Sequence, residues 1–467
     1  MAMGAEKGHE ATRQIEILCL DELVAADDLY RRLDGLVDWR FVREAAAPFY
    51  AGHLGRPSVD PIVLLKLMLA GALEGCASMR ELLRVAALRL DLRRFLGYGF
   101  GERLPAHQTV SDAHTLRFAG SDLFERLFAR SVALCAQHGL LDGTHLSIDG
   151  FHAEADAALS SLRASLAGLP GGEGAEHEAE AGDAEGEPGA EGEPGADDEP
   201  HGQLSLAEVD GERPQLSLAA PRAGRTPKRK SSNATAQSRT DADARLRGKP
   251  GQRPHLVHRG QVAVDPRARV IVACCGELAV GFEGDAVPGL LDRARFHVPD
   301  LESFAADRGY ASKAVWQEAA RRRLAAYVPP RRDQLPSCGA PPGSEAQAEA
   351  AAAKRRCRTA AGVWAHARRL ADSEGAIAEL KCRRGMGRAR RRGTAAFHEQ
   401  LLVAAAAVNL RRLVRWRPAA SGAAAQSGKG TGAQARVGCS NYAARAAAPP
   451  WHESLQPHFM TVTLCLN

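Results

Sequence analysis

Residues 146–151 read LSIDGF, and this stretch decides the fold that we predict for the chain. Apolar and polar side chains alternate along it, as they do in a strand with one buried face. Leu146 and Ile148 therefore point to one face of the predicted strand, and Asp149 points to the other. Gly150 follows and leaves room for a substrate to approach the backbone. The stretch predicts a strand that carries a carboxylate at its end, beside a binding surface.

Further strands and helices alternate downstream of this stretch. Residues 261–265 and 269–275 are apolar enough for strands, and residues 285–295 have the pattern of a helix. A short strand over 303–307 ends in Asp307 and is followed by a helix from Ser312, a strand over 324–328 and an Ala-rich helical stretch that carries Glu374 and Lys381. This alternation predicts an α/β domain built on one sheet.

The first 140 residues have a helical pattern without strands. Asp60 precedes a proline at the first position of a predicted helix, and Ser78 with Glu81 forms a capping box for the next. Thr109 and Ser121 are placed to cap two more helices. We therefore expect a compact helical bundle before the sheet domain.

Composition bounds the class of protein. At 467 residues the chain is long enough for two or three domains, and with 45% apolar residues it can bury a core. The apolar runs are too short for a membrane span, and the N-terminus has no apolar segment of a secretory signal. The ten cysteines show no metal-binding spacing, which favours a reducing cytosol. We expect a cytoplasmic protein that does not interact with a membrane.

Charge is distributed unevenly along the chain. Residues 173–199 hold twelve acidic residues and no basic ones, whereas residues 354–416 hold sixteen Lys and Arg against four Asp and Glu. The basic segment indicates a polyanionic partner, although a solvated arginine-rich surface is the plain alternative. Residues 165–235 contain short repeats and opposite charge blocks, so we predict a disordered insertion there. Residues 417–467 are rich in Ala, Gly and Ser and are predicted to be a disordered tail.

Three carboxylates occupy positions that suit metal-dependent chemistry. Asp149 and Asp307 end predicted strands, where ligands gather in open α/β sheets, and Glu374 lies on a helix after the sheet. Mg²⁺ prefers such oxygen ligands, and two ions held close together can promote phosphoryl transfer. Each residue also has a simpler interpretation: a turn at Asp149, an ion pair of Asp307 with Arg308, and a surface pair of Glu374 with Lys381. Position alone leaves both interpretations open.

Several strings, taken in order, resemble bacterial insertion-sequence transposases of the DDE type. The similar strings lie at residues 55–84, 105–118, 146–157 (LSIDGFHAEADA), 238–247, 306–312 (ADRGYAS), 373–393 and 401–413. Together they span roughly residues 20–165 and 235–416. The resemblance implies a helical N-terminal domain over 1–140 for DNA binding and dimerisation. It also implies an RNase H-like mixed sheet flanked by helices, over 141–164 and 236–416.

The same resemblance implies an activity and its residues. Asp149, Asp307 and Glu374 would be catalytic and would hold Mg²⁺, with Mn²⁺ as a possible substitute. The resemblance further implies cleavage at the element ends and joining of the 3′-hydroxyls to target DNA. The partners would be double-stranded DNA, as terminal inverted repeats and as target, and other copies of the chain in a homo-oligomer near the bacterial nucleoid. The DNA-contacting residues would be basic: Lys381, Arg388, Arg390, Arg391 and Arg392.

The helix of Glu374 departs from the pattern in relatives. They place an Arg four residues and a Tyr seven residues before the Glu, where this chain has Leu370 and Ala367, with Arg368 and Arg369 out of register. A catalytically decayed or repurposed transposase that only binds DNA is therefore the alternative, and a metal-dependent nuclease that does not join ends is a second one.

Three polar residues outside this set are expected to be structural or incidental. Asn409, in an apolar helix, is expected to be a buried hydrogen-bonding residue. His107 is expected to be structural, near a helix start, and His152 incidental to the strand.

Overall fold

The computed structural model describes residues 18–50, 58–164, 233, 236–248, 253–337 and 341–416. The predicted disordered insertion at 165–235, apart from Asn233, and the predicted tail at 417–467 lie outside the described residues. The described residues outside 164–236 belong to one compact unit.

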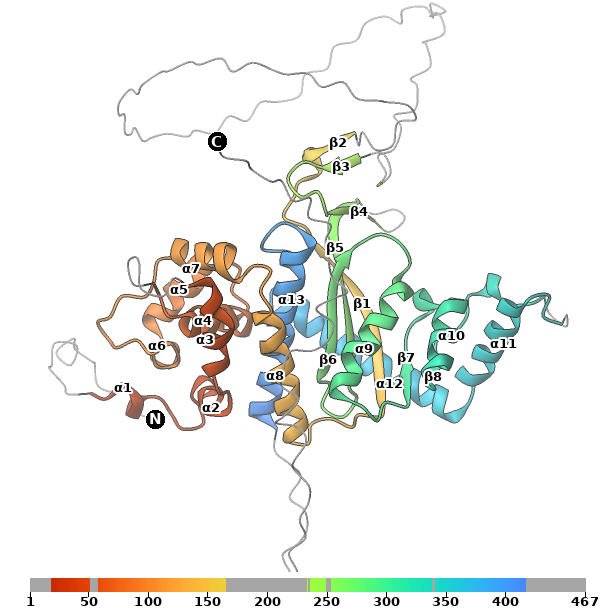
Figure 1. Ribbon diagram of the computed structural model, residues 1–467, viewed down its shortest axis with the longest axis horizontal. Coiled ribbons are helices and arrows are strands. Elements are labelled where there is room, and N and C mark those ends of the chain that lie inside the picture. The colour runs from red at the N-terminus through yellow and green to blue at the C-terminus, as the bar shows by residue number, and fades with distance from the viewer. Residues whose placement is uncertain are drawn as a thin grey trace, which may run out of the picture. The chain divides into compact units, whose positions relative to one another are not determined.

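The N-terminal region is helical, as predicted (Figure 1). Its most buried helix is α4, whose residues from Leu64 to Leu73 are all buried. The other helices pack around it or follow it along the chain. The helices of this region are α1 (Leu20–Leu23), α2 (Leu29–Leu36), α3 (Arg40–Ala46), η2 (Ala47–Phe49), α4 (Pro61–Glu74), α5 (Met79–Leu88), α6 (Leu90–Leu96), α7 (His107–Ala113), the π-helix η3 (His114–Phe118) and α8 (Leu123–Gln137).

Two of the four predicted helix caps are correct. The Asp60 carboxylate accepts a hydrogen bond from the N–H of Ile62, and the Ser78 hydroxyl accepts one from the N–H of Glu81. The prediction for Thr109 is wrong. Thr109 lies inside α7, because extended backbone at Ala106 already starts that helix two residues earlier. The prediction for Ser121 is one residue early, because the N-cap of α8 is Asp122, whose side chain forms no cap. The Ser121 hydroxyl donates to the Phe118 carbonyl at 2.7 Å and accepts a long hydrogen bond, 3.4 Å, from the N–H of Leu123.

The second half of the unit is built on a six-stranded mixed sheet. Its main path runs β4-β5-β1-β7-β8, and β6 pairs with the same edge of β5 as β4 does. β1 is antiparallel to β5, and β5 to β6, whereas β7 and β8 are parallel to β1. This order, β6-β5-β1-β7-β8, with these directions, is that of the expected RNase H-like fold. The strands are β1 (His145–Glu154), β4 (Arg245–Arg247), β5 (His255–Val264), β6 (Ile271–Leu278), β7 (Ser303–Ala305) and β8 (Ala325–Tyr327).

Element bounds differ from the predictions in informative ways. The strand predicted at 261–265 is the last part of the longer β5, whose early polar residues pair with β4 and β1. Asp149 lies in the middle of β1 rather than at its end, because β1 continues to Glu154 along β5. However, β7 pairs with β1 only as far as Ser147, so Asp149 lies just beyond the parallel part of the sheet. A small separate sheet pairs β2 (Leu162–Ala164) with β3 (Ala236–Ser238).

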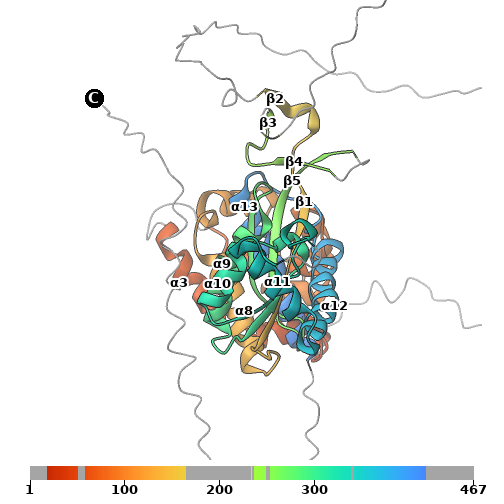
Figure 2. The same ribbon diagram turned by 90° about the vertical axis from the view of Figure 1, so that its right-hand side faces the viewer.

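Helices cover both faces of the main sheet. In Figure 2, α12 lies on one side of the sheet and α9 and α10 lie on the other. α11 packs between α10 and α12. The helix predicted at 285–295 begins at Val287, after the 3-10 turn η6 (Glu283–Ala286). The helices are α9 (Val287–His297), α10 (Lys313–Arg321), α11 (Glu345–Cys357), α12 (Ala360–Arg383) and α13 (Thr394–Arg415); the 3-10 turns η4 (Leu159–Ser161), η7 (Arg308–Tyr310) and η8 (Arg332–Gln334) join other elements.

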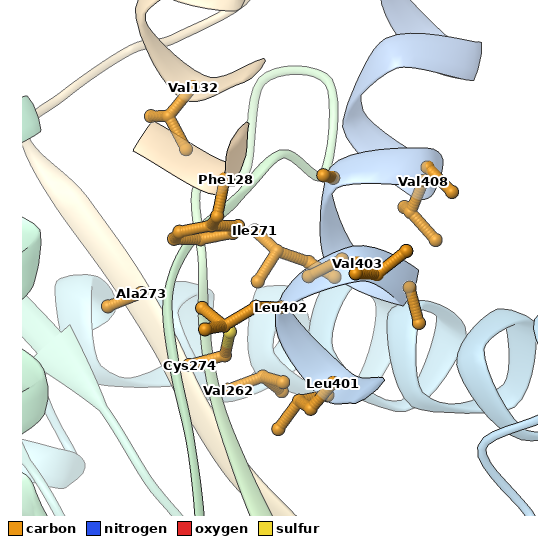
Figure 3. Packing of buried hydrophobic residues seen from close by; sticks show 14 of the residues in the cluster. Phe128, Val132, Val262, Ile271, Ala273, Cys274, Leu401, Leu402, Val403 and Val408 are labelled. Atoms are coloured by element: carbon orange, nitrogen blue, oxygen red, sulfur yellow. The ribbon is translucent and has the colours of Figure 1, made fainter. Parts of the chain in front are cut away.

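The last helix, α13, joins the helical region to the sheet. It packs against both α8 and β6, and Figure 3 shows side chains from these elements and β5 interlocking around Ile271 and Leu402. Asn409 is fully buried in this interface, as expected. Its amide donates to the Ile271 carbonyl and its oxygen accepts from the Ile271 N–H, both at 2.9 Å. Asn409 thus satisfies both backbone groups of a residue at the start of β6.

Among the residues that the structure describes, no single helix is long and apolar enough to cross a membrane. Helices α4 and α5 would reach that length only as a pair, and they meet at an angle of 94°.

Candidate active site

Asp149 points from β1 toward α12. Its Oδ2 atom accepts hydrogen bonds from Arg369 Nη1 at 2.8 Å and from Ser373 Oγ at 3.3 Å, and its Oδ1 atom accepts one from the N–H of Gly150. Arg369 and Ser373 are four residues apart, so they share one face of α12. His145, on the same face of β1 as Asp149, packs edge-on against Trp364. Asp149 thus lies on the face of β1 opposite Leu146 and Ile148, as predicted, and this face is the one toward α12.

Asp307 lies beside Asp149 at the end of the next strand. The last paired residues of the two strands are Ser147 and Ala305, and each aspartate follows two residues later, just beyond the parallel part of the sheet. Asp307 Oδ1 accepts a hydrogen bond from the N–H of Gly309 at 2.7 Å and so fixes the turn η7.

The environment of Asp149 disfavours its negative charge. Burial raises the pKa of Asp149, and the negative charge of Asp307 adds to this effect, while Gly150 and Arg369 oppose it. Two neighbouring carboxylates of this kind favour the binding of a cation.

A polar network supports this site from the other face of the sheet. The hydroxyl of Tyr310, in the turn after Asp307, donates to the side chain of Gln261 on β5. Gln261 in turn donates to Glu277 on β6 at 2.8 Å. A Cβ placed on Gly150 would lie 2.9 Å from Gln261 Oε1 and 3.0 Å from the Tyr310 hydroxyl, so a larger residue there would displace this network.

Glu374 is on the helix that contacts Asp149, but it faces solvent. It directly follows Ser373, and it lies on an exposed stripe of α12 with Ala367, Leu370 and Lys381. Within the described residues no hydrogen bond or ion pair involves its carboxylate. The structure therefore brings Asp149 and Asp307 together and leaves Glu374 adjacent. Within the same residues, no group of three or more His, Cys, Asp or Glu side chains could hold a metal ion.

Arg369 is a site residue that the sequence pattern did not single out. It was out of register with the Arg of relatives, yet it reaches the Asp149 carboxylate from the side of α12 that faces β1. Only 13% of its side chain is exposed, so the pair is largely shielded from solvent. Tyr310 and Gln261 were missed as well. A signal existed for Gln261, since a glutamine inside a buried strand must find a partner.

The basic segment after α12, residues 388–392, forms backbone hydrogen bonds at the end of β1. The N–H of Ala389 donates to the Glu154 carbonyl at 2.7 Å, and the N–H of Glu154 donates to the Gly387 carbonyl at 2.9 Å. This places the arginines of residues 388–392 beside the strand that carries Asp149.

The five predicted DNA-contacting residues occupy different environments. Lys381 is exposed, and Arg388 and Arg392 are more than half exposed beside Asp156, at 3.2 Å and 3.8 Å. Arg390 is exposed as a residue, with its guanidinium lying over Gly71 of α4.

Arg391 is mainly engaged within the protein. Its guanidinium pairs with Glu399 of α13, a buried carboxylate that also contacts His114 and the N–H of Gly120. Glu399 is buried and must be compensated, so Arg391 has a structural role in addition to any contact with DNA.

Within the described residues, neither His152 nor His107 belongs to a group of side chains that could hold a metal ion. His152, on β1, is partly buried, and burial together with nearby Arg247, Arg259 and Lys381 lowers its pKa to about 4. His107 is the first residue of α7 and is partly exposed.

Comparison with known families gives two matches. Residues 18–115 match the family described as Transposase domain (DUF772), and residues 343–414 match the family described as Transposase DDE domain. The first match covers most of the helical region, and the second contains Glu374 and the basic segment but not Asp149 or Asp307. Comparisons with curated proteins and with solved structures found no match. The two family matches support an insertion-sequence DDE transposase.

Proposed function

Since the chain carries a transposase domain and a transposase DDE domain in this order, we propose that it cuts DNA at the ends of its insertion sequence and joins the freed 3′-hydroxyls to target DNA. One observation carries this proposal: Asp149 and Asp307 lie just beyond the paired residues of the adjacent strands β1 and β7 in an RNase H-like sheet, and Asp149 contacts the helix that the DDE match covers.

The two aspartates fit a divalent cation. They present hard oxygen ligands, and their mutual repulsion would be relieved by a bound positive charge. Mg²⁺ is the ion we propose, with Mn²⁺ able to replace it. When bound, a pair of such ions would polarise the phosphodiester and assist a hydroxyl nucleophile in an in-line displacement.

Glu374 and Arg369 would complete the site from α12. Glu374 is exposed, and it follows Ser373, which contacts Asp149. We propose that its carboxylate turns toward the aspartates when a cation is bound. Arg369 neutralises Asp149 in the protein alone. We propose that this guanidinium turns to a DNA phosphate when the aspartates engage a cation, because it cannot neutralise Asp149 and a phosphate equally well at once.

The remaining parts of the chain would position DNA. Lys381 shares the exposed stripe of α12 with Glu374, and a phosphate held there would lie near the cut. Arg388 and Arg392 would contact the backbone from the loop fixed to β1.

We further propose a division of labour between two domains. Residues 1–140 would bind the terminal inverted repeats and pair protomers, while 141–164 with 236–416 would carry out catalysis. Two ends must be cut together, which favours a homo-oligomer on DNA.

Cleavage of duplex DNA carrying the element's own ends tests the proposal. Wild-type protein should cut at the end in Mg²⁺ or Mn²⁺ and not in EDTA. Asp149→Asn, Asp307→Asn and Glu374→Gln should each reduce cutting by at least about 100-fold, because each removes a ligand charge. Glu302→Gln, an exposed glutamate at the opposite end of β7, is the matched control and should cut normally. Cutting that survives in all three variants would contradict the proposed site.

Joining is tested separately from cutting. Precut ends should join to a target duplex when they carry a 3′-hydroxyl and fail when they carry a 3′-deoxy end. Cutting without any joining would favour a metal-dependent nuclease.

A second candidate function is DNA binding without catalysis, by a decayed transposase. It is favoured by Leu370 and Ala367, which replace the Arg and Tyr of relatives on the exposed face of α12, and by the separation of Glu374 from the aspartates. Specific binding to the element ends with no cutting in either metal by the wild type would establish this alternative.

A further inference from the structure

A groove of about 540 Å³ lies in the helical region, far along the chain from the proposed catalytic carboxylates. One wall is α5, and the other is the segment 101–107, which leads from α6 into α7. α5 and α7 pack against each other at this place (Figure 1).

The groove has an apolar floor and a basic rim. Leu83, Ala87, Leu104 and Pro105 supply apolar lining. The rim is basic because Arg80 and Arg84 are four residues apart on α5 and so share the face that borders the groove. The opposite face of α5 holds Leu82 and Ala86, which are buried in the core.

A third arginine, Arg103, faces these two from the opposite wall. Arg80, Arg84 and Arg103 are all exposed. In the part of the chain that the structure describes, none of the three forms an ion pair or a side-chain hydrogen bond.

The wall that carries Arg103 is held rigidly. The guanidinium of Arg93, which is 91% buried, donates to the carbonyls of Ala87, Gly99 and Glu102. The one acidic residue that lines the groove, Glu102, has its carboxylate engaged by the N–H of Gly99 at 3.2 Å. Three unpaired guanidinium groups therefore surround a preformed groove with little opposing charge.

We propose that this groove binds the sugar–phosphate backbone of duplex DNA at the element ends, an inference that rests on the proposed function. Arginine forks match phosphate oxygens, and basic groups that contact phosphates supply most of the affinity of proteins for DNA. The apolar floor suits the deoxyribose between two phosphates. His107, at the end of the groove, is placed to donate to the same backbone when it carries a proton on the groove side.

Binding of the full-length protein to an end duplex, measured by fluorescence anisotropy against salt concentration, tests this proposal. Replacing Arg80, Arg84 and Arg103 together by Ala should weaken binding by at least about 30-fold at 0.1 M salt. The plot of the logarithm of the association constant against the logarithm of the salt concentration should become less steep by roughly two to three, about 0.9 for each lost phosphate contact. Arg267→Ala, which removes an exposed arginine outside residues 1–140 without a side-chain partner among the described residues, is the matched control and should change neither value.

The outcomes separate this inference from the proposed function. Unchanged affinity and slope in the triple variant, with the wild type binding the end duplex, would overturn the groove as a DNA site and leave the proposed function standing. Failure of the wild type to bind any duplex would overturn both. An altered oligomeric state with unchanged DNA affinity would assign the groove to a protein contact instead. The thermal unfolding midpoint should not change, because the three side chains are exposed and unpaired within the described structure.

Discussion

Replacing Asn409 by Ala should destabilise the protein by about 3 kcal/mol. The substitution removes two hydrogen bonds of 2.9 Å and leaves the N–H and the carbonyl of Ile271 buried without partners. Each buried polar group without a hydrogen-bond partner lowers the free energy of unfolding by about 1–3 kcal/mol, and the lost side-chain volume lowers it further. Since α13 packs against both α8 and β6, the loss should weaken the whole unit rather than one helix end.

Urea denaturation followed by far-ultraviolet circular dichroism measures this effect. The midpoint should fall while the slope of free energy against urea stays the same. Ser131→Ala is the matched control, because the Ser131 hydroxyl is 3.3 Å from the Asn409 side chain. Its removal leaves both backbone groups of Ile271 hydrogen-bonded to Asn409. It should cost less than about 1 kcal/mol. A loss below about 1 kcal/mol in Asn409→Ala would refute the argument that this amide satisfies the start of β6.

Two further substitutions test the site and its supporting helix. Arg369→Met removes the counter-ion of Asp149 and should raise the pKa of that carboxyl further. A carboxyl whose pKa is higher in the folded than in the unfolded protein destabilises the fold at a pH at which it must be ionised. The destabilisation should therefore be about 3 kcal/mol near pH 8 and smaller near pH 5. Urea titrations at the two pH values check this, with exposed Arg308→Met as the control, and an equal loss at both would contradict it. Gly362→Ala, at the start of α12, would place a Cβ 2.5 Å from a backbone oxygen of α11 and should lower the thermal midpoint by several degrees. Gly289→Ala in α9 meets nothing within 4 Å and should raise it slightly, so equal shifts would count against this packing argument.

The sheet was predictable because its strands carry strong local signals. The alternation of apolar and polar residues in LSIDGF correctly predicted the face of the strand on which Asp149 lies. The apolar run at 269–275 correctly predicted a strand, which is β6 in the structure. The order of the strands did not follow from these signals, and only the family resemblance supplied it. Strand order depends on which apolar faces pack together, which a short stretch of sequence does not encode.

The site was predictable in part, for a related reason. The face of Asp149 follows from the alternation along β1, and Asp307 follows a short apolar strand, and both are local signals. The contact between Arg369 and Asp149 depends on how α12 is rotated about its axis relative to β1. The spacing of residues in a sequence motif does not reveal that rotation. The pairing of Arg391 with Glu399 likewise needs two segments to meet, so its structural role was hidden in a run of arginines.

The most direct test of the account is metal rescue of a ligand variant. Asp307→Cys replaces a hard oxygen ligand with a thiolate, which Mg²⁺ accepts poorly and Mn²⁺ accepts better. Cleavage of end DNA should be compared for this variant and wild type at about pH 8.5, where roughly half of an ordinary thiol is ionised. The account predicts that the variant is inactive in Mg²⁺ and regains cutting in Mn²⁺, while the wild type cuts in both. A folded variant that stays inactive in both metals, or that cuts in Mg²⁺ as well as the wild type does, would contradict the claim that Asp307 holds a catalytic cation.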